Sequence, residues 1–234
     1  MRYDAGFFQR QGGPSLQSAR ALIPQIVRWL EPKSLVDVGC GIGTWAAVAL
    51  SEGVSDVLGI DGAYVDRQQL LIPSDRFVVR DLAQSFRLDR RFDVAICLEV
   101  AEHLPPSRGP GLIDDLCALS EVVVFSAAVP GQQGTRHVNL RWQSYWADLF
   151  IKRGRTIVGD LRALVWRDSR VGWWYRQNII VASAIALPDL DHQPLLDVVH
   201  PESTFRDVGM RTLLGAMPSA TRAWARRRLR APYT

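Results

Sequence analysis

The segment from Ser34 to Ser51 constrains the fold more than any other part of the sequence. It begins with a short apolar run over 34–38, continues through a cluster of glycines, and ends in a predicted helix over 44–51. Glycines at a strand-to-helix turn let the backbone turn tightly and approach a ligand without a Cβ in the way. The segment therefore predicts a β-strand, a ligand-binding loop and a helix.

The same alternation of apolar runs and helical patterns extends over most of the chain. Strands are predicted at 34–38, 57–60, 76–79, 92–98, 121–126, 156–158 and 178–182, and helices at 15–30, 44–51, 107–119 and 144–153. This alternation favours an α/β fold with a Rossmann-like, doubly wound, mostly parallel seven-stranded sheet. With 47% apolar and 22% charged residues, the chain is able to bury a core of that size.

These elements divide the chain into three parts. Residues 15–187 form the predicted folded domain. Residues 1–14 form an N-terminal segment whose Tyr3, Phe7 and Phe8 either close the site as a lid or pack on the sheet edge. From residue 188 the pattern degrades into loops, and 188–234 is predicted to be a C-terminal extension with an arginine-rich tail.

The positive charge of the chain is concentrated in that tail. The sequence has 28 Lys and Arg against 24 Asp and Glu, a formal charge of +4, and five of the arginines lie between Arg222 and Arg230. The rest of the chain is close to neutral, whereas phosphate contacts need a Lys/Arg surface, so no nucleic-acid partner is expected. The tail is predicted to be solvated, or to contact a membrane surface or an acidic partner.

The remaining composition favours a cytoplasmic protein. Cys40, Cys97 and Cys117 are an odd number without C-x-x-C spacing, which favours a reducing compartment. The N-terminus lacks the apolar run of a signal peptide, and no stretch of about 18 apolar residues predicts a membrane span. A homodimer stays open as the oligomeric state.

The glycine cluster carries an acid, Asp37, two residues before Gly39. The run Gly41-x-Gly43-x-x-Ala46 matches the dinucleotide pattern G-x-G-x-x-G/A weakly. Asp37 would repel a pyrophosphate lying over the loop, whereas an acid there suits the cationic end of a ligand. The residues therefore argue against a dinucleotide site.

The run over 36–44 resembles motif I of the class I S-adenosylmethionine (SAM)-dependent methyltransferases. The resemblance covers roughly residues 15–185 and implies that SAM is the cofactor. It implies that Asp61, which ends the second strand, binds the ribose diol, and that Asp81 and Leu82 lie near the adenine. The implied cofactor-binding residues are Asp37, Gly39, Cys40, Gly41, Gly43, Asp61, Asp81, Leu82 and Leu98.

A second group of polar residues follows the fourth strand. If this segment turns helically, Glu99, Glu102 and His103 lie on one face. Two carboxylates and an imidazole packed together repel or desolvate one another unless a proton or a cation joins them. A divalent metal is one resolution, and His137, in the loop after the fifth strand, is a candidate fourth ligand.

The spacing resembles the Glu-x-x-Glu-His signature of two metal-dependent groups, the small-RNA 3′-terminal 2′-O-methyltransferases and the ubiquinone-pathway O-methyltransferases. It implies that Glu99, Glu102, His103 and His137 hold a divalent metal, with Mg²⁺ or Mn²⁺ suited to the mixed ligands. Many SAM methyltransferases carry a Glu-His pair here without a metal. The candidate catalytic residues are His137, His103 and Glu102, with a histidine as general base where no metal binds.

Substrate recognition is expected from a polar loop and two groups of aromatic residues. The loop over 130–139 runs into Trp142, Tyr145 and Trp146, and Trp166 and the run 173–175 form the second group. Aromatic faces beside amide and arginine donors suit carbohydrates or aglycones, although such residues also build cores. The runs 125–131, 137–139 and 173–178 resemble bacterial methyltransferases of polysaccharide and glycosylated natural-product pathways.

Together these features predict a SAM-dependent O-methyltransferase, assisted by a divalent metal, that acts on a hydroxyl of a sugar, an oligosaccharide or polysaccharide precursor, or a glycosylated metabolite. Three alternatives stay open. They are methylation of an RNA 3′-terminal ribose, methylation of a phenol or catechol, and a SAM-binding partner protein without activity of its own.

Overall fold

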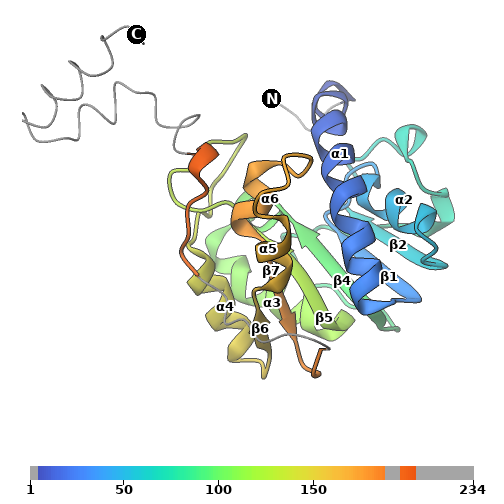
Figure 1. The fold of residues 1–234 in the computed structure, drawn as a ribbon. Helices are drawn as coiled ribbons and strands as arrows, with labels where there is room; N and C mark the ends of the chain where they lie inside the picture. Colours follow the sequence, from blue (N-terminus) through green and yellow to red (C-terminus); the bar gives the residue numbers. More distant parts are fainter. Residues whose placement is uncertain (1–4, 188–195, 204–234) are drawn as a thin grey trace, which may run out of the picture.

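The computed structural model describes residues 5–187 and 196–203, with side chains from residue 13 onward. In this part, seven strands form one sheet in the order β3-β2-β1-β4-β5-β7-β6 (Figure 1). The strands are β1 (Ser34–Val38), β2 (Asp56–Asp61), β3 (Phe77–Val79), β4 (Phe92–Leu98), β5 (Ser120–Ser126), β6 (Thr156–Val158) and β7 (Ile180–Ser183). The pairs that involve β7 are antiparallel and the others are parallel, which confirms the predicted sheet.

Helices cover both faces of this sheet (Figure 1). Helices α1 (Ala5–Leu30), α2 (Thr44–Ser51) and α5 (Asp160–Val165) pack on one face, and α3 (Gly109–Leu119) and α4 (Gln143–Ile151) on the other. Successive strand residues alternate between the two cores, since Leu35 belongs to the first and Val36 to the second. Both faces of the central strands are therefore apolar, as expected for a parallel sheet.

The strand directions bring several loops to one edge of the sheet. Because β1, β4 and β5 are parallel, the segments that follow them emerge at the same edge. Strand β7 runs the other way, and its first residue, Ile180, pairs with Phe125 near the end of β5. Helix α6 (Trp173–Asn178), which precedes β7, therefore lies at that edge too.

The elements differ from prediction at several places, and among them α3 begins at Gly109 rather than Ser107 and α4 ends at Ile151 rather than Arg153. Helix α1 begins at Ala5 rather than Ser15 and continues through Pro14, whose carbonyl accepts a hydrogen bond from Ser18 Oγ (2.8 Å). Helices α5 and α6 were not predicted, because six residues are too few for a helical apolar period to be recognised. The last strand begins at Ile180 rather than Asn178, because Asn178 still belongs to α6.

Part of the C-terminal extension packs on the folded domain. Asp197 accepts hydrogen bonds from the backbone and hydroxyl of Ser144 (2.9 and 2.8 Å), and the His200 amide donates to Gln177 Oε1 (2.9 Å). The boundary at residues 187 and 188 stays a prediction. The side chains of the N-terminal segment's aromatic residues and the arginines from Arg222 to Arg230 lie outside the described part, and their expected contacts stay predictions too. No described helix combines the length and hydropathy needed to cross a bilayer.

Candidate active site

The loop between β1 and α2 approaches its neighbours too closely for residues other than glycine. Gly39, Gly41 and Gly43 have φ angles of 82°, 56° and 84°, a region that L side chains rarely adopt. A Cβ on Gly39 would lie 2.3 Å from Val100 Cγ2, and a Cβ on Gly43 would lie 3.0 Å from Ile72 Cγ1. The glycines therefore let the loop pack tightly while its backbone borders the site.

Two carboxylates lie beside this loop, in β1 and at the end of β2. Asp61 accepts hydrogen bonds from the amides of Gly41 (2.7 Å) and Gly62 (2.6 Å) and from the Tyr64 hydroxyl. Asp37 is 3% exposed, and its Oδ2 has no hydrogen-bond partner in the described part of the chain. Burial, and secondly the charge of Asp61, raise the pKa of Asp37 to about 8. A buried carboxylate with spare acceptor capacity fits a cationic ligand end, such as the amino group of SAM.

Two cavities of about 660 and 560 Å³ lie at this edge of the sheet. We name them the His137 cavity, which is the larger, and the Asp81 cavity, after residues that line them. They share Gly39, Gly41, Glu99 and His103. The shared residues make the two cavities neighbours, as a site for a cofactor and an acceptor requires.

The predicted cofactor residues are distributed over both cavities and the structure behind them. Cys40 and Leu98 line the His137 cavity, whereas Asp61, Asp81 and Leu82 line the Asp81 cavity. Asp37 and Gly43 line neither. Tyr64, which sequence reasoning missed, also lines the Asp81 cavity. A lone tyrosine after a predicted strand carries no sequence signal of this kind.

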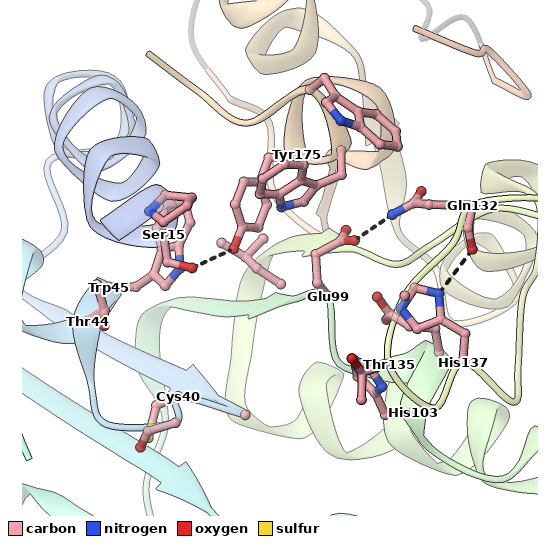
Figure 2. Close-up of a pocket in the computed structure, with 18 of the residues that line it drawn as sticks. Ser15, Cys40, Thr44, Trp45, Glu99, His103, Gln132, Thr135, His137 and Tyr175 are labelled. Carbon is pink, nitrogen blue, oxygen red and sulfur yellow. Dashed lines mark hydrogen bonds between the residues drawn. The ribbon is translucent and has the colours of Figure 1, made fainter. Parts of the chain in front are cut away.

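Three of the four predicted metal ligands come together on the wall of the His137 cavity. Glu102, His103 and His137 each offer a ligand atom within 4.8 Å of the others, and the imidazole centroids are 5.1 Å apart (Figure 2). Glu102 is fully buried, and neither carboxylate oxygen has a hydrogen-bond partner within the described residues. A buried carboxylate left without donors fits a cation held together with the two imidazoles.

The electrostatics of the group reflect its burial. Burial, followed by the neighbouring charge of Glu99, raises the pKa of Glu102. Burial, followed by His137, lowers the pKa of His103 to about 4, and burial also lowers the pKa of His137. The imidazoles are therefore neutral near pH 7, which is the form that coordinates a metal or accepts a proton.

Hydrogen bonds hold the loop after β5 over the segment after β4. The amides of Val138 and Asn139 donate to the Glu102 carbonyl (2.8 and 3.1 Å), and Asn139 Nδ2 donates to the Ala101 carbonyl (3.2 Å). His137 Nδ1 lies 3.2 Å from the Gln132 carbonyl. This docking confirms that the fourth and fifth strands bring the loop over the Glu-His segment, as the strand order implied.

Glu99 lies outside the Glu102–His103–His137 group, because the segment does not form the helical turn that the spacing assumed. Glu99 has a φ angle of 57°, and the chain then enters a 3-10 helix, η3 (Ala101–His103). The Glu99 carboxylate accepts hydrogen bonds from Asn178 Nδ2 (3.1 Å) and Gln132 Nε2 (3.2 Å; Figure 2). Sequence reasoning missed Asn178, because it was assigned to a strand.

The aromatic residues divide between the cavity and the core. The run 173–175 of α6 lines the His137 cavity together with Trp45, whose ring lies 5.0 Å from that of Tyr175. Trp146 is instead 1% exposed and belongs to the core, and Trp142 lines neither cavity. Trp166 packs against His200 at a centroid distance of 4.6 Å. Of the two predicted aromatic groups, the second therefore lines the cavity, through its residues 173–175 in α6.

Comparisons with known proteins agree with this architecture. A family model for a methyltransferase domain matches residues 12–175. A search of curated proteins found no match. Among solved structures, the chain is similar to the methyltransferase domain of bacterial CtHen1-C, with 18% identity, a TM-score of 0.54, and coverage of 73% of this chain and 98% of that chain.

Two further solved structures share the fold. Magnesium protoporphyrin IX methyltransferase (ChlM) from Synechocystis PCC 6803, with bound SAH, is 19% identical, with a TM-score of 0.50 and coverage of 74% of this chain and 84% of that chain. An O-methyltransferase family protein from Burkholderia thailandensis is 13% identical, with a TM-score of 0.56 and coverage of 75% and 57%. The family model, the seven-stranded sheet and the acid-flanked glycine loop together show that the chain belongs to the class I SAM-dependent methyltransferases.

Proposed function

We propose that this methyltransferase is an O-methyltransferase assisted by a divalent metal, and that its acceptor is a hydroxyl of a sugar, an oligosaccharide or polysaccharide precursor, or a glycosylated metabolite. The observation that carries the proposal is the Glu102–His103–His137 group, which borders the cavity that adjoins the glycine loop. An O-methyltransferase must bring a weakly acidic hydroxyl next to SAM and take up its proton, and this group lies where both tasks are possible.

Different residues of the site are proposed to bind the cofactor and the acceptor, according to the cavity that each one lines. Asp37 and Asp61 are proposed to bind the amino end and the ribose diol of SAM, and Asp81 and Leu82 to border its adenine. SAM supplies an activated methyl group, so the protein mainly has to align the acceptor. The aromatic residues of α6 and Trp45 provide flat apolar surfaces for a sugar ring or an aglycone.

Glu102, His103 and His137 are proposed to hold the metal, with Mg²⁺ or Mn²⁺ expected for a carboxylate and imidazole set. A bound divalent ion would lower the pKa of a coordinated water from 15.7, to about 7 in the best case, that of Zn²⁺, and would lower the pKa of a coordinated hydroxyl in the same direction. Glu99 stays a candidate fourth ligand, since its charge acts on Glu102. In the absence of a metal, the neutral imidazole of His137 or His103 is the candidate general base.

The test is a methyl-transfer screen with mono- and disaccharides, with Mg²⁺, with Mn²⁺ and with excess EDTA. We expect turnover of a saccharide that EDTA abolishes. We also expect Glu102→Ala to lose activity by at least roughly 100-fold, more than the loss of an outer partner of a metal ligand. The matched control is Glu52→Ala, which removes an exposed carboxylate. Full activity of Glu102→Ala in EDTA would disprove the metal proposal.

The same screen distinguishes the alternative acceptors. An RNA oligonucleotide with a free 3′-terminal ribose and a catechol belong in the panel, since both offer hydroxyls compatible with a metal site. Preferential methylation of either would replace the saccharide proposal while leaving O-methylation intact. The partner-protein alternative would be favoured by a different result. The protein would then bind SAM without methylating any acceptor, and it would increase the activity of a second protein.

A further inference from the structure

A buried ion pair lies next to the loop that follows β3. Arg108 belongs to a 3-10 helix, η4 (Pro106–Arg108), and its side chain is 7% exposed. Its guanidinium pairs with Asp115 of α3, whose side chain is fully buried. The proposed chemistry of the site uses neither residue. Burying a charge pair costs free energy unless the remaining donors and acceptors of both side chains form hydrogen bonds. The hydrogen-bond partners of the pair therefore show which segment of the chain it stabilises.

Those partners are four residues of the loop over 82–86, and Asp115 pairs in addition with the exposed Arg87 that follows the loop. Arg108 Nε donates to the Leu82 carbonyl (2.8 Å), and Arg108 Nη2 donates to the Gln84 carbonyl (2.9 Å). The Asp115 carboxylate accepts hydrogen bonds from Ser85 Oγ (3.0 Å) and from the Phe86 amide (3.3 Å). Two side chains from outside the loop therefore fix its backbone at three positions and the Ser85 side chain as well.

The first turn of α3 leaves space for this guanidinium. A Cβ on Gly111 would lie 2.6 Å from Arg108 Nη1. Glycine weakens a helix at this position, so its presence has a packing reason here. Because several hydrogen bonds hold the guanidinium in place, it is not free to move aside as an exposed arginine would.

The loop that the pair holds is a wall of the Asp81 cavity. Leu82 and Ala83 line that cavity, and Leu82 is 6% exposed. Arg108 also follows His103 and Leu104, which line the same cavity, by five and four residues. The ion pair thus supports the wall formed by Leu82 and Ala83 in the cavity that the adenosine part of SAM is expected to occupy.

We propose that Arg108 and Asp115 are positioning residues for the cofactor, which hold the loop over 82–86 in the conformation that binds the adenosine part of SAM. The pair touches no ligand itself. The proposal concerns the cofactor of the family and is independent of the acceptor and of the metal.

The experiment measures binding of two ligands by calorimetry. One is S-adenosylhomocysteine (SAH), the product that remains after SAM has lost its methyl group. The other is 5′-methylthioadenosine, which contains the adenosine part and lacks the amino acid. In Arg108→Met we expect both dissociation constants to rise by a similar factor of at least about 10, the effect of losing a buried hydrogen bond to a charged group. Arg108→Lys should not rescue binding, because an ammonium group cannot reproduce the planar guanidinium contacts.

The matched control is Arg153→Met. Arg153 also bonds to α3, through Asp114 (2.6 Å) and the Pro110 carbonyl (2.9 Å), without contacting the loop. We expect its dissociation constants to equal those of the native protein. Hydrogen exchange should accelerate at the amides of 82–86 in Arg108→Met and not in Arg153→Met, a difference that general destabilisation would not produce.

Gly111→Ala decides the question if Arg108→Met does not fold. It keeps both charges and displaces the guanidinium, so we again expect equal weakening of both ligands. Unchanged binding in a folded Gly111→Ala or Arg108→Met variant would overturn the proposal. It would also be overturned if SAH binding weakened while methylthioadenosine binding did not, because the pair would then act on the amino-acid part. Either result leaves the proposed O-methylation standing.

Discussion

At the scale of single residues, the burial of Asp37, a residue proposed to bind the cofactor, lowers the stability of the folded protein at neutral pH. Burial raises the pKa of Asp37 to about 8 from 3.8. The unfolded chain releases this proton at a lower pH than the folded chain does. Stability is therefore lost as pH rises from about 4 to about 8, and a cationic ligand restores part of it.

Asp37→Asn should thus stabilise the ligand-free protein and weaken cofactor binding. At pH 8 we expect a gain of about 1 kcal/mol or more, which raises Tm by roughly 2–4 °C in a domain of this size. The gain should shrink toward pH 4, because below the unfolded-state pKa of 3.8 the Asp37 carboxyl is protonated in both the folded and the unfolded chain. Thermal unfolding from pH 4 to pH 8, with calorimetry of SAH binding, measures both effects. A gain that is independent of pH would contradict this explanation.

Gly134 lies so close to His137 that a larger residue at this position would collide with the imidazole. A Cβ at this position would lie 2.1 Å from His137 Nε2 and 2.2 Å from Cε1. The imidazole therefore lies directly against the loop backbone. Its position depends on a missing side chain as well as on the Gln132 carbonyl near Nδ1.

Gly134→Ala should displace the His137 ring and weaken the proposed metal site. We expect the dissociation constant for Mn²⁺ to rise by roughly 10- to 100-fold, the range for disturbed support of a metal ligand, while SAH binding stays unchanged. Titration of Mn²⁺ by calorimetry measures the first and SAH titration the second. Gly13→Ala is the control, because a Cβ on Gly13 meets nothing within 4 Å. Equal Mn²⁺ affinity in both variants would contradict the expected contact.

At the scale of elements, α6 presents polar side chains to the interior of the protein. Gln177 is fully buried and donates to Gln132 Oε1 (3.2 Å), and Asn178 is 2% exposed and donates to the same atom (3.0 Å) and to Glu99. The helix thereby connects the segment after β4 with the loop after β5. Glu99, whose backbone is in the left-handed region, depends on this network for its orientation.

Asn178→Ala should cost about 1–3 kcal/mol of stability, because it removes one of the donors to each of the buried acceptors Glu99 and Gln132. Since Glu99 borders both cavities, we also expect slower methyl transfer at saturating SAM. Chemical unfolding and single-turnover rates separate the two effects. Asp168→Ala serves as the comparison, since its partner Arg170 is largely exposed and the pair is expected to contribute little. A free energy of unfolding equal to that of the unmodified protein would show that the hydrogen bonds of Asn178 do not contribute to stability.

The elements also show what the sequence was able to predict. The strand over 92–98 and the helix over 44–51 were predicted to the residue, because buried apolar runs and a glycine boundary carry strong local signals. The short helices α5 and α6 were missed, and so was the left-handed turn at Glu99, which tertiary hydrogen bonds stabilise. The acids proposed to bind SAM lie in or beside predicted strands, so their positions near the site followed from the sequence, while their role stays a prediction. Asn178, Gln132 and Arg108 act through contacts between distant segments, which the sequence pattern does not indicate.

At the scale of the whole molecule, the cofactor and the metal are expected to stabilise the fold independently. The Asp81 cavity and the Glu102–His103–His137 group share the segment after β4, which carries His103. His137 follows β5, whereas the rest of the cavity lining lies in or after β1, β2 and β3. A ligand at 100 times its dissociation constant stabilises the native state by about 2.7 kcal/mol. We therefore expect SAH to raise Tm equally with and without EDTA, and Mn²⁺ to add a separate increase. Loss of the SAH effect in EDTA would show that the two sites are coupled.

The antiparallel direction of β7 separates much of the two proposed binding surfaces along the chain. The loops proposed to bind the cofactor follow β1, β2 and β3, whereas the proposed acceptor wall, apart from Trp45 and the segment after β4, follows β5 or precedes β7. Four residues border both cavities, and none of them belongs to those acceptor segments. We therefore expect substitutions of cavity-lining residues between Ala127 and Asn178, other than His137, to alter acceptor choice while the loops proposed to bind SAM keep their sequence. New acceptors would then require changes in a single contiguous stretch of the chain.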